Sequence, residues 1–439
     1  MVSIFELFLI VLFILFVEVT VLKVDLSSPA FIFTASFFIC SMTSCYVSKD
    51  WGIELVHLRT YNMIIFSLLV FLSIEELIRF VFYKKYNKKF DWKQRSGNLK
   101  LKSICIPFSV VKLSVVLNSI GILWALMYIY NYLVAGDWIA MMANYKDAIN
   151  ADNYSVGSGK MMLNQLSKII VAFNYILLFI YNNNKCSGVT MSSKVNRFYI
   201  ISFVSYMLFR IFLTGGRQSA LFFLVAWLTC NIICKICTEN KSNIKKAEKN
   251  YFIVLASVVA IVFPLFHFFG RFVGRKDGMV LDAATSYLST GFYGLDCIVG
   301  DGHLSRYWGM KSFPALFPLL KYLGVLPLDL EPQSFLDFFA YGNTVTLLGR
   351  YCWDFGEVGV FIMIAMFAIV FSYIYYSRIK YPISTHDRNM SIILYCYMIH
   401  VLYFAGYDDF AMNFISLSFL LNVFIIYFCY KYIVIKEGR

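Results

Sequence analysis

Long apolar runs are the feature that most restricts how this chain can fold. Of its 439 residues, 60% are hydrophobic and only 15% are charged, whereas soluble domains carry roughly 25% charged residues. A helix of about 20 apolar residues crosses a bilayer. The sequence therefore predicts an all-α polytopic integral membrane protein with about eleven, or eleven to twelve, transmembrane helices. Their expected ranges are 4–22, 28–47, 61–82, 104–133, 161–181, 198–213, 218–236, 251–269, 358–377, 389–405 and 411–432.

Basic residues in the connectors predict which way the chain crosses the membrane. Lys and Arg concentrate in residues 83–102, 182–197, 235–250, 378–388 and 431–439. Alternating spans bring all five segments to one side, and cytoplasmic loops are enriched in Lys and Arg. We therefore expect this side to be the cytoplasm. The net charge of +13 is explained by these loops, so no nucleic-acid partner is expected.

The chain divides into three expected regions. Residues 1–269 hold helices one to eight with short loops, residues 270–357 form a large periplasmic loop, and residues 358–439 hold the last three helices and a cytoplasmic tail. The large loop is rich in Arg, Lys, Asp and aromatic residues. Because long loops of this kind are often functional, we expect the site in this loop.

Motifs for nucleotide and metal chemistry are missing from the sequence. It contains no GxxxxGK[ST], no GxGxxG after a strand and no HExxH, so ATP hydrolysis, dinucleotide chemistry and metalloprotease activity are not indicated. None of the eleven cysteines belongs to a set with zinc-site spacing. We therefore expect neither a cofactor nor a metal.

Two arginines mark a hairpin on the expected outer side. Arg217 lies in the turn Thr214–Gln218, whose two glycines permit a tight reversal with positive φ. Arg210 lies about one helical turn deeper, inside an apolar span. An arginine at that depth is expensive and is a candidate for a functional group that faces the bundle interior. The alternative for both is snorkelling to the interface.

A second group of arginines begins the large loop. His267, Arg271 and Arg275 recur every four residues, so they share one face if the helix continues. Guanidinium groups bind phosphate oxygens in a bidentate way. Arg271 and Arg275 are therefore candidate ligands of a lipid-linked diphosphate, and Arg350 is a further one. Equally open is pairing with nearby aspartates or phospholipid headgroups.

Candidate bases are found in the same loop and near the end of the chain. His303 is a candidate because imidazole titrates near neutrality, although a lone loop histidine is more often simply solvated. Asp354 is the second candidate, and Glu357, Asp408 and Asp409 are alternatives.

Aromatic residues of the loop, Tyr341 among them, suit stacking on sugar rings. An interfacial aromatic belt is the commoner explanation for such residues.

Two stretches, TGGRQSALFFLVAW and YGNTVTLLGRYCWDFGEVGV, resemble the bacterial O-antigen polymerases, the Wzy family of oligosaccharide repeat-unit polymerases. That family shows a Gly-Arg turn that opens a span, then an Asn-Thr stretch, then Asp/Glu-Phe-Gly-x-x-Gly at the start of another span. The matching residues here are Gly216, Arg217, Asn343, Thr344, Asp354, Phe355, Gly356 and Gly359.

The resemblance implies a glycosyltransferase with GT-C-like architecture in the bacterial inner (plasma) membrane. Such an enzyme moves a growing glycan from one undecaprenyl diphosphate carrier onto the non-reducing end of a new carrier-linked repeat unit. Expected partners are undecaprenyl-diphosphate-linked oligosaccharides, membrane lipids and a chain-length regulator protein. The alternatives are an O-antigen ligase, which transfers the glycan to lipid A core, and a flippase or transporter for the lipid-linked oligosaccharide.

Overall fold

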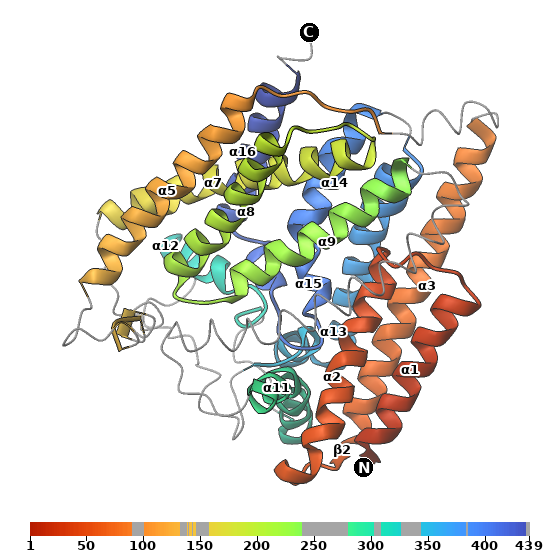
Figure 1. The fold of residues 1–439 in the computed structure, drawn as a ribbon. Coiled ribbons are helices and arrows are strands. Elements are labelled where there is room, and N and C mark those ends of the chain that lie inside the picture. Colours follow the sequence, from red (N-terminus) through yellow and green to blue (C-terminus); the bar gives the residue numbers. More distant parts are fainter. Residues whose placement is uncertain are drawn as a thin grey trace. The chain divides into compact units, whose positions relative to one another are not determined.

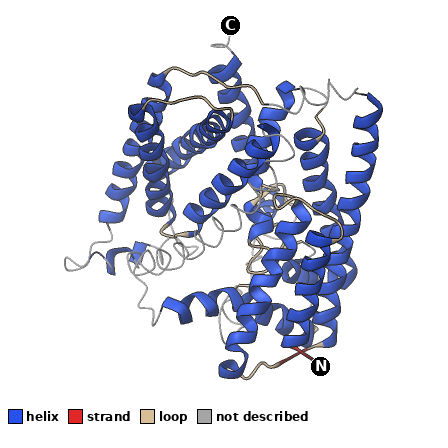
Figure 2. Ribbon diagram, turned by 45° about the vertical axis from the view of Figure 1, so that its right-hand side comes forward, coloured by secondary structure: helices blue, strands red, loops and turns tan. Residues whose placement is uncertain are grey.

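A computed structural model describes residues 1–89, 101–131, 138, 140–142, 144–145, 158–238, 280–302, 309–325, 344–382 and 385–435. Within these ranges the chain is almost entirely helical (Figure 1), and helices dominate equally in the turned view (Figure 2). The two strands, β1 (Val2–Ser3) and β2 (Leu55–Val56), form a short antiparallel pair that ties the N-terminus to the start of α3.

The chain forms two compact units, each made from separate parts of the sequence. Unit 1 comprises Met1–Asp91, Leu281–Ile383 and Met398–Leu420. Unit 2 comprises Trp92–Val280, Ser384–Tyr397 and Leu421–Arg439. Both units therefore combine an early part of the chain with segments from its last third.

Unit 1 is built on four long helices. Helices α1 (Ile4–Thr20), α2 (Pro29–Trp51) and α3 (Leu58–Lys89) pack together, and α13 (Leu347–Tyr373) packs against α3. Local sequence fixes the ends of α2. The Ser28 hydroxyl accepts the N–H of Phe31 at 3.4 Å, and Pro29 occupies the first turn, where no N–H is needed. Gly52 ends the helix in the left-handed conformation.

The other described elements of unit 1 are one further long helix and several short ones. They are α11 (Val280–Asp301), η1 (Pro314–Leu316), α12 (Phe317–Tyr322), the π-helix η2 (Ile374–Lys380), α15 (His400–Tyr403) and η3 (Ala411–Asn413).

Helix α13 is interrupted at Gly356. This residue has φ 69° and ψ −172°, a combination that is essentially restricted to glycine. A short helix from Leu347 therefore precedes the break, and the long apolar helix follows it and continues into η2.

Unit 2 contains α5 (Phe108–Tyr130), α7 (Ser158–Cys186), α8 (Ser193–Thr214), α9 (Gln218–Thr238), α14 (Thr385–Met398) and most of α16 (Leu417–Tyr430), followed by η4 (Lys431–Ile435). A buried polar network joins three of these helices. Asn174 donates to Asn118 at 2.9 Å, and Asn118 donates to the Ser202 carbonyl at 2.8 Å. Amide contacts of this kind hold helices together where the surroundings are apolar.

Seven of the described helical stretches are long and apolar enough to cross a membrane, by length and composition. They are Pro29–Trp51, Phe108–Tyr130, Gly159–Cys186, Ser193–Thr214, Gln218–Thr238, Leu347–Lys380 and Leu417–Val434. The chain is thus an all-helical membrane protein, as the apolar runs predict. The total of eleven or twelve spans stays a prediction, and the expected span 251–269 lies outside the described residues.

The structure places helices inside the segment 270–357, which the sequence alone indicates as a loop. Helix α11 is one of them, and α13 begins at Leu347 rather than near residue 358. In α11 the buried residues Phe292, Leu295 and Val299 recur at three- and four-residue spacing, which is the pattern of an amphipathic helix. Such a helix is less apolar than a membrane span and escapes a search for long apolar runs.

Candidate functional site

The structure describes four of the nine predicted site residues. Arg350 and Asp354 lie in unit 1, and Arg210 and Arg217 lie in unit 2. The other five lie outside the described residues, and their roles stay predictions: Arg271, Arg275, His303, Tyr341 and Asn343.

The predicted glycine turn is present between α8 and α9. Helix α8 ends at Thr214, and Gly215 follows with φ 61°, so one of the two glycines has the expected positive φ. Arg217 comes directly before α9, but only 7% of it is exposed. Its side chain is therefore buried and is not displayed on the surface.

Arg210 lies among polar side chains of several helices in unit 2. Its guanidinium donates to the Ser219 hydroxyl at 3.3 Å, and it interacts electrostatically with Tyr175, Tyr206 and Tyr397. These partners belong to α9, α7, α8 and α14. Because all of them lie on packed helices, Arg210 faces the interior of its helix bundle, as the cost of placing an arginine in a span predicts.

Unit 1 brings charged residues from three separate segments together at the start of α13. We call this group the Arg350 cluster. Its members are Lys311, Arg350, Tyr351, Asp354, Asp408 and Asp409. Arg350 links the segments: its Nη2 donates to Asp408 Oδ1 at 3.4 Å, and its Nη1 donates to the Lys311 carbonyl at 3.5 Å. The cluster is thus a single charged network built across the fold.

Asp354 orders the chain that leads into α12. Its carboxylate is buried and accepts the main-chain N–H groups of Lys311, at 3.2 and 3.0 Å, and of Ser312, at 2.6 Å. Both oxygens therefore stabilise a turn. This geometry suits a positioning role better than the role of a base, for which Asp354 is a candidate in the sequence.

Lys311 joins the cluster without having been singled out from the sequence. It is 4% exposed, and its Nζ lies 5.0 Å from the centroid of the Trp353 ring. The pKa of Lys311 is lowered to about 8, mainly by burial and also by the positive Arg350, while Asp354 opposes the shift. Lys311 is one of seven Lys and Arg residues spaced along segment 270–357. Nothing in the sequence around it indicates burial, so only the fold identifies this residue.

Asp408 and Asp409 supply two adjacent buried carboxyl groups. Asp408 Oδ1 accepts both the Arg350 guanidinium and the Asp409 N–H, the latter at 2.8 Å. Asp409 Oδ1 accepts the N–H of Ala411 at 2.8 Å. Burial raises the pKa of Asp409 to about 7, with Asp408 adding to the shift and Arg350 opposing it. Burial also raises the pKa of Asp408. Asp409 is thus a carboxyl group that exchanges its proton near neutral pH.

Close backbone contacts fix the segment that carries these two aspartates. A Cβ atom at Gly291 of α11 would lie 2.4 Å from the Tyr407 carbonyl oxygen, and one at Gly406 would lie 2.9 Å from the Ser36 carbonyl oxygen of α2. The Ala405 carbonyl also accepts the N–H of Leu347, the first residue of α13, at 2.7 Å. The aspartates are therefore held by backbone packed between helices.

The hydroxyl of Tyr351 and Oδ2 of Asp409, both in the Arg350 cluster, are buried and have no hydrogen-bond partner among the described residues. The two residues interact electrostatically, and Asp409 is the largest charged influence on Tyr351, ahead of Arg350 and Asp354. Because buried polar groups are nearly always satisfied, two unsatisfied groups in one cluster require an explanation.

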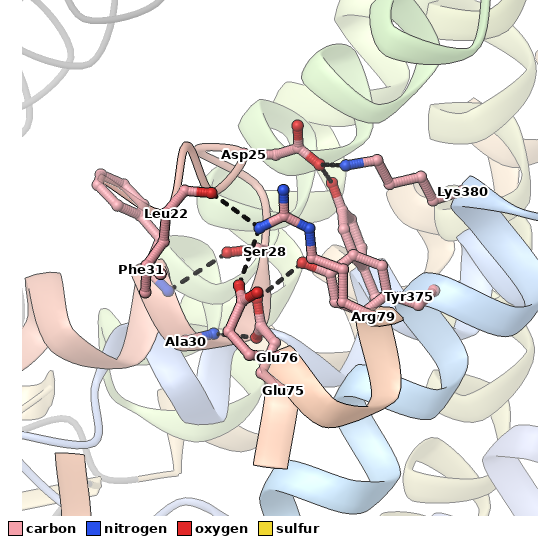
Figure 3. A network of polar contacts seen from close by, with 11 residues as sticks. Leu22, Asp25, Ser28, Ala30, Phe31, Glu75, Glu76, Arg79, Tyr375 and Lys380 are labelled. Atoms are coloured by element: carbon pink, nitrogen blue, oxygen red, sulfur yellow. Dashed lines mark hydrogen bonds and ion pairs between the residues drawn. The ribbon is translucent and has the colours of Figure 1, made fainter. Parts of the chain in front are cut away.

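A second polar network lies at the far end of the same helical stretch, around η2 (Figure 3). We call it the Lys380 cluster; it consists of Asp25, Glu75, Glu76, Arg79, Tyr375, Tyr376 and Lys380. Lys380 forms an ion pair with Asp25, which also accepts the Tyr375 hydroxyl at 3.0 Å. Glu75 accepts the Tyr376 hydroxyl at 2.9 Å and the N–H of Ala30 at 2.6 Å.

Arg79 completes the Lys380 cluster. Its Nη1 donates to the Leu22 carbonyl at 2.9 Å and to Glu76 at 2.8 Å (Figure 3). Within the described chain, no buried side-chain nitrogen or oxygen of this cluster lacks a partner. A fully satisfied network of this kind joins α2, α3 and η2 and needs no ligand.

Comparison of the chain with family models, with curated proteins and with solved structures gave no match.

Proposed function

We propose that this chain is a membrane glycosyltransferase of the O-antigen polymerase kind, with a GT-C-like helix arrangement. It transfers a growing glycan from one undecaprenyl diphosphate carrier onto the non-reducing end of a carrier-linked repeat unit. The reaction takes place at the periplasmic face of a bacterial inner membrane.

The Arg350 cluster is the observation that supports this proposal most. It gathers two cations and three carboxyl groups at the end of a membrane-length helix, and most of these side chains are buried. A transfer between two lipid-linked substrates needs reactive groups close to the membrane surface and away from bulk water, since water would hydrolyse the donor. The burial of the cluster and its place at the end of a membrane-length helix support such a role.

Carboxylates and cations have different roles in glycosyl transfer. A carboxylate accepts the proton of the attacking hydroxyl, and cations neutralise the departing diphosphate. Lys311 lies beside Arg350 in the cluster, and both are engaged there with carboxylates or an aromatic ring. Of the arginines predicted as diphosphate ligands, Arg350 belongs to this cluster, and the roles of Arg210, Arg217, Arg271 and Arg275 stay predictions.

The test is the glycan ladder of cells from which the native copy of this chain has been deleted. Expression of the chain restores a ladder of glycan lengths if it polymerises repeat units. A single repeat unit attached to lipid A core, with no ladder, supports the ligase alternative. The absence of any glycan change contradicts both transferase assignments.

Arg350 variants sharpen the same assay. Lysine cannot reproduce the guanidinium contacts of Arg350, and loss of one charge-assisted contact, about 1.5–3 kcal/mol, corresponds to a rate decrease of roughly ten- to more than a hundredfold. We expect Arg350→Lys to shorten the ladder strongly. Arg59→Ala is the matched control, because Arg59 is exposed and its ion pair to Glu357, at 3.9 Å, lies on the surface. Equal ladders from both variants would remove Arg350 from the site.

A further inference from the structure

The unsatisfied pair in the Arg350 cluster has the hydrogen-bonding pattern that complements a hydroxyl group. Asp409 Oδ2 can accept a hydrogen bond, and the Tyr351 hydroxyl can donate one. A bound alcohol would donate to the carboxylate through its hydrogen and accept from the tyrosine through its oxygen. A buried polar group left unsatisfied destabilises the protein, so a ligand that satisfies both groups is favoured.

Neighbouring groups fix the orientation of the Asp409 carboxylate. Its Oδ1 accepts the N–H of Ala411 at 2.8 Å, the N–H of Met412 also acts on the carboxylate, and Oδ2 has no hydrogen-bond partner among the described residues. The charged groups that act on Asp409 are Arg350 and Asp408, and Tyr351 faces it from α13. Arg350 in turn is held by Asp408 at 3.4 Å. The carboxylate is thus held through Oδ1, and Oδ2 keeps its capacity to accept a hydrogen bond.

We propose that Asp409 is the proton acceptor for the sugar hydroxyl of the acceptor repeat unit, and that Tyr351 positions this hydroxyl. This inference rests on the proposed glycosyl transfer. The hydroxyl oxygen forms a bond to the anomeric carbon of the donor glycan while the bond from that carbon to the diphosphate oxygen breaks. The electron pair leaves with the diphosphate, and the hydroxyl proton moves to Asp409 Oδ2.

The burial of the pair is consistent with this role. Tyr351 and Asp409 are both fully buried, so a hydroxyl that reaches them leaves bulk water behind, which strengthens its contacts and limits hydrolysis of the donor. Catalytic contacts are often incomplete in ligand-free proteins and form only with substrate. Independently, burial gives Asp409 a pKa of about 7, and a base with a pKa near the working pH is the most effective.

The experiment uses the full chain in nanodiscs. The probe is the undecaprenyl-diphosphate-linked repeat unit extracted from cells that lack this chain, and the rate of dimer formation is measured from pH 5 to pH 9. We expect the wild-type rate to rise with pH through about 7. Above pH 7, Asp409→Asn should lower the rate by about 10²–10⁴-fold, the usual contribution of a general base, and it should abolish the rise of the rate with pH. Asp409→Glu keeps a carboxylate, so this variant should retain part of the wild-type rate, and that rate should still depend on pH.

Two matched controls separate chemistry from folding. Asp50→Asn removes an exposed carboxylate of unit 1, and Tyr46→Phe removes an exposed hydroxyl; both should leave the rate unchanged. Tyr351→Phe should raise KM for the repeat unit and leave the pH midpoint near its wild-type value, because the tyrosine orients the hydroxyl and does not take its proton.

The outcomes distinguish this inference from the proposed function. A wild-type chain that forms no dimer under any condition overturns the proposed function. A wild-type chain that forms dimers, together with an Asp409→Asn chain within threefold of its rate, overturns only the role of Asp409. If Asp409→Asn fails to fold, the pH profile of Asp409→Glu is decisive. This variant moves the carboxylate by one methylene group. If the pH midpoint of its rate is the same as that of wild type, the result contradicts the inference.

Discussion

The two polar clusters of unit 1 lie at opposite ends of one helical stretch, Leu347–Lys380, and differ in one respect. Both are buried, and both combine basic, acidic and tyrosine side chains. In the Lys380 cluster the polar atoms satisfy one another, whereas the Arg350 cluster contains the unsatisfied Tyr351 hydroxyl and Asp409 Oδ2. A satisfied network stabilises packing, and an unsatisfied one is kept at the expense of stability. We therefore interpret the first as structural and the second as functional.

The largest expected effect is a loss of stability when the Lys380 cluster is disrupted. Asp25→Asn should leave Lys380 in a mostly buried position without its negative partner, since their side chains are only 16% and 20% exposed. Breaking a buried ion pair from one side lowers stability by about 3–5 kcal/mol. The measurement is the free energy of unfolding in detergent. The double variant Asp25→Asn, Lys380→Met should recover part of the loss, and a single variant as stable as wild type would contradict a structural role.

The Arg350 cluster should make the stability of the protein depend on pH through Asp409. Because the folded-state pKa of Asp409 is raised to about 7, the folded protein binds this proton more tightly than the unfolded chain, whose pKa is about 3.9. The stabilisation is complete below pH 4 and is lost as the pH rises through about 7. The Asp409→Asn variant has no such titration, so its stability does not fall in this way. Between pH 5 and pH 8 its free energy of unfolding should therefore increase relative to that of wild type by roughly 2–3 kcal/mol. If the difference between the two proteins does not change with pH, Asp409 does not titrate in this range.

A substitution in α11 tests whether backbone packing builds the Arg350 cluster. Gly291→Ala would place a methyl group 2.4 Å from the Tyr407 carbonyl oxygen, so the segment that carries Asp408 and Asp409 must shift. Overpacking of this kind lowers stability by about 1–3 kcal/mol, and transfer activity should fall as well. The control is Gly216→Ala, whose added methyl group has its closest neighbours at 3.9 Å. Equal melting temperatures for the two variants would contradict the proposed packing.

The sequence predicts the helices well and the site only in part. Apolar runs identify helices such as α7, α8 and α9 within a few residues, because membrane spans are long and uniform. They miss α11, whose apolar residues occupy one face. The positive φ in the Thr214–Gln218 turn was also predictable, since glycine there has a direct physical reason.

The composition of the Arg350 cluster was not predictable from the sequence. Arg350 and Asp354 were candidates, but nothing local shows that Asp354 binds the N–H groups of Lys311 and Ser312. Asp409 ranked behind Asp354 as a base. Its burial depends on contacts of residues 404–410 with α2 and α11, far away in the chain, and burial is what gives a carboxyl group an unusual pKa.

The most direct test of the difference between the clusters compares two Tyr→Phe substitutions on one helical stretch. Tyr376 donates to Glu75 at 2.9 Å, whereas the Tyr351 hydroxyl has no hydrogen-bond partner within the described ranges of the chain. Tyr376→Phe should lower the free energy of unfolding by about 1.5–3 kcal/mol, the contribution of a hydrogen bond to a charged group. Tyr351→Phe should leave it unchanged or raise it by about 1 kcal/mol, because it removes an unsatisfied buried hydroxyl. A Tyr351→Phe chain that is destabilised as much as Tyr376→Phe would contradict the distinction between a structural and a functional cluster.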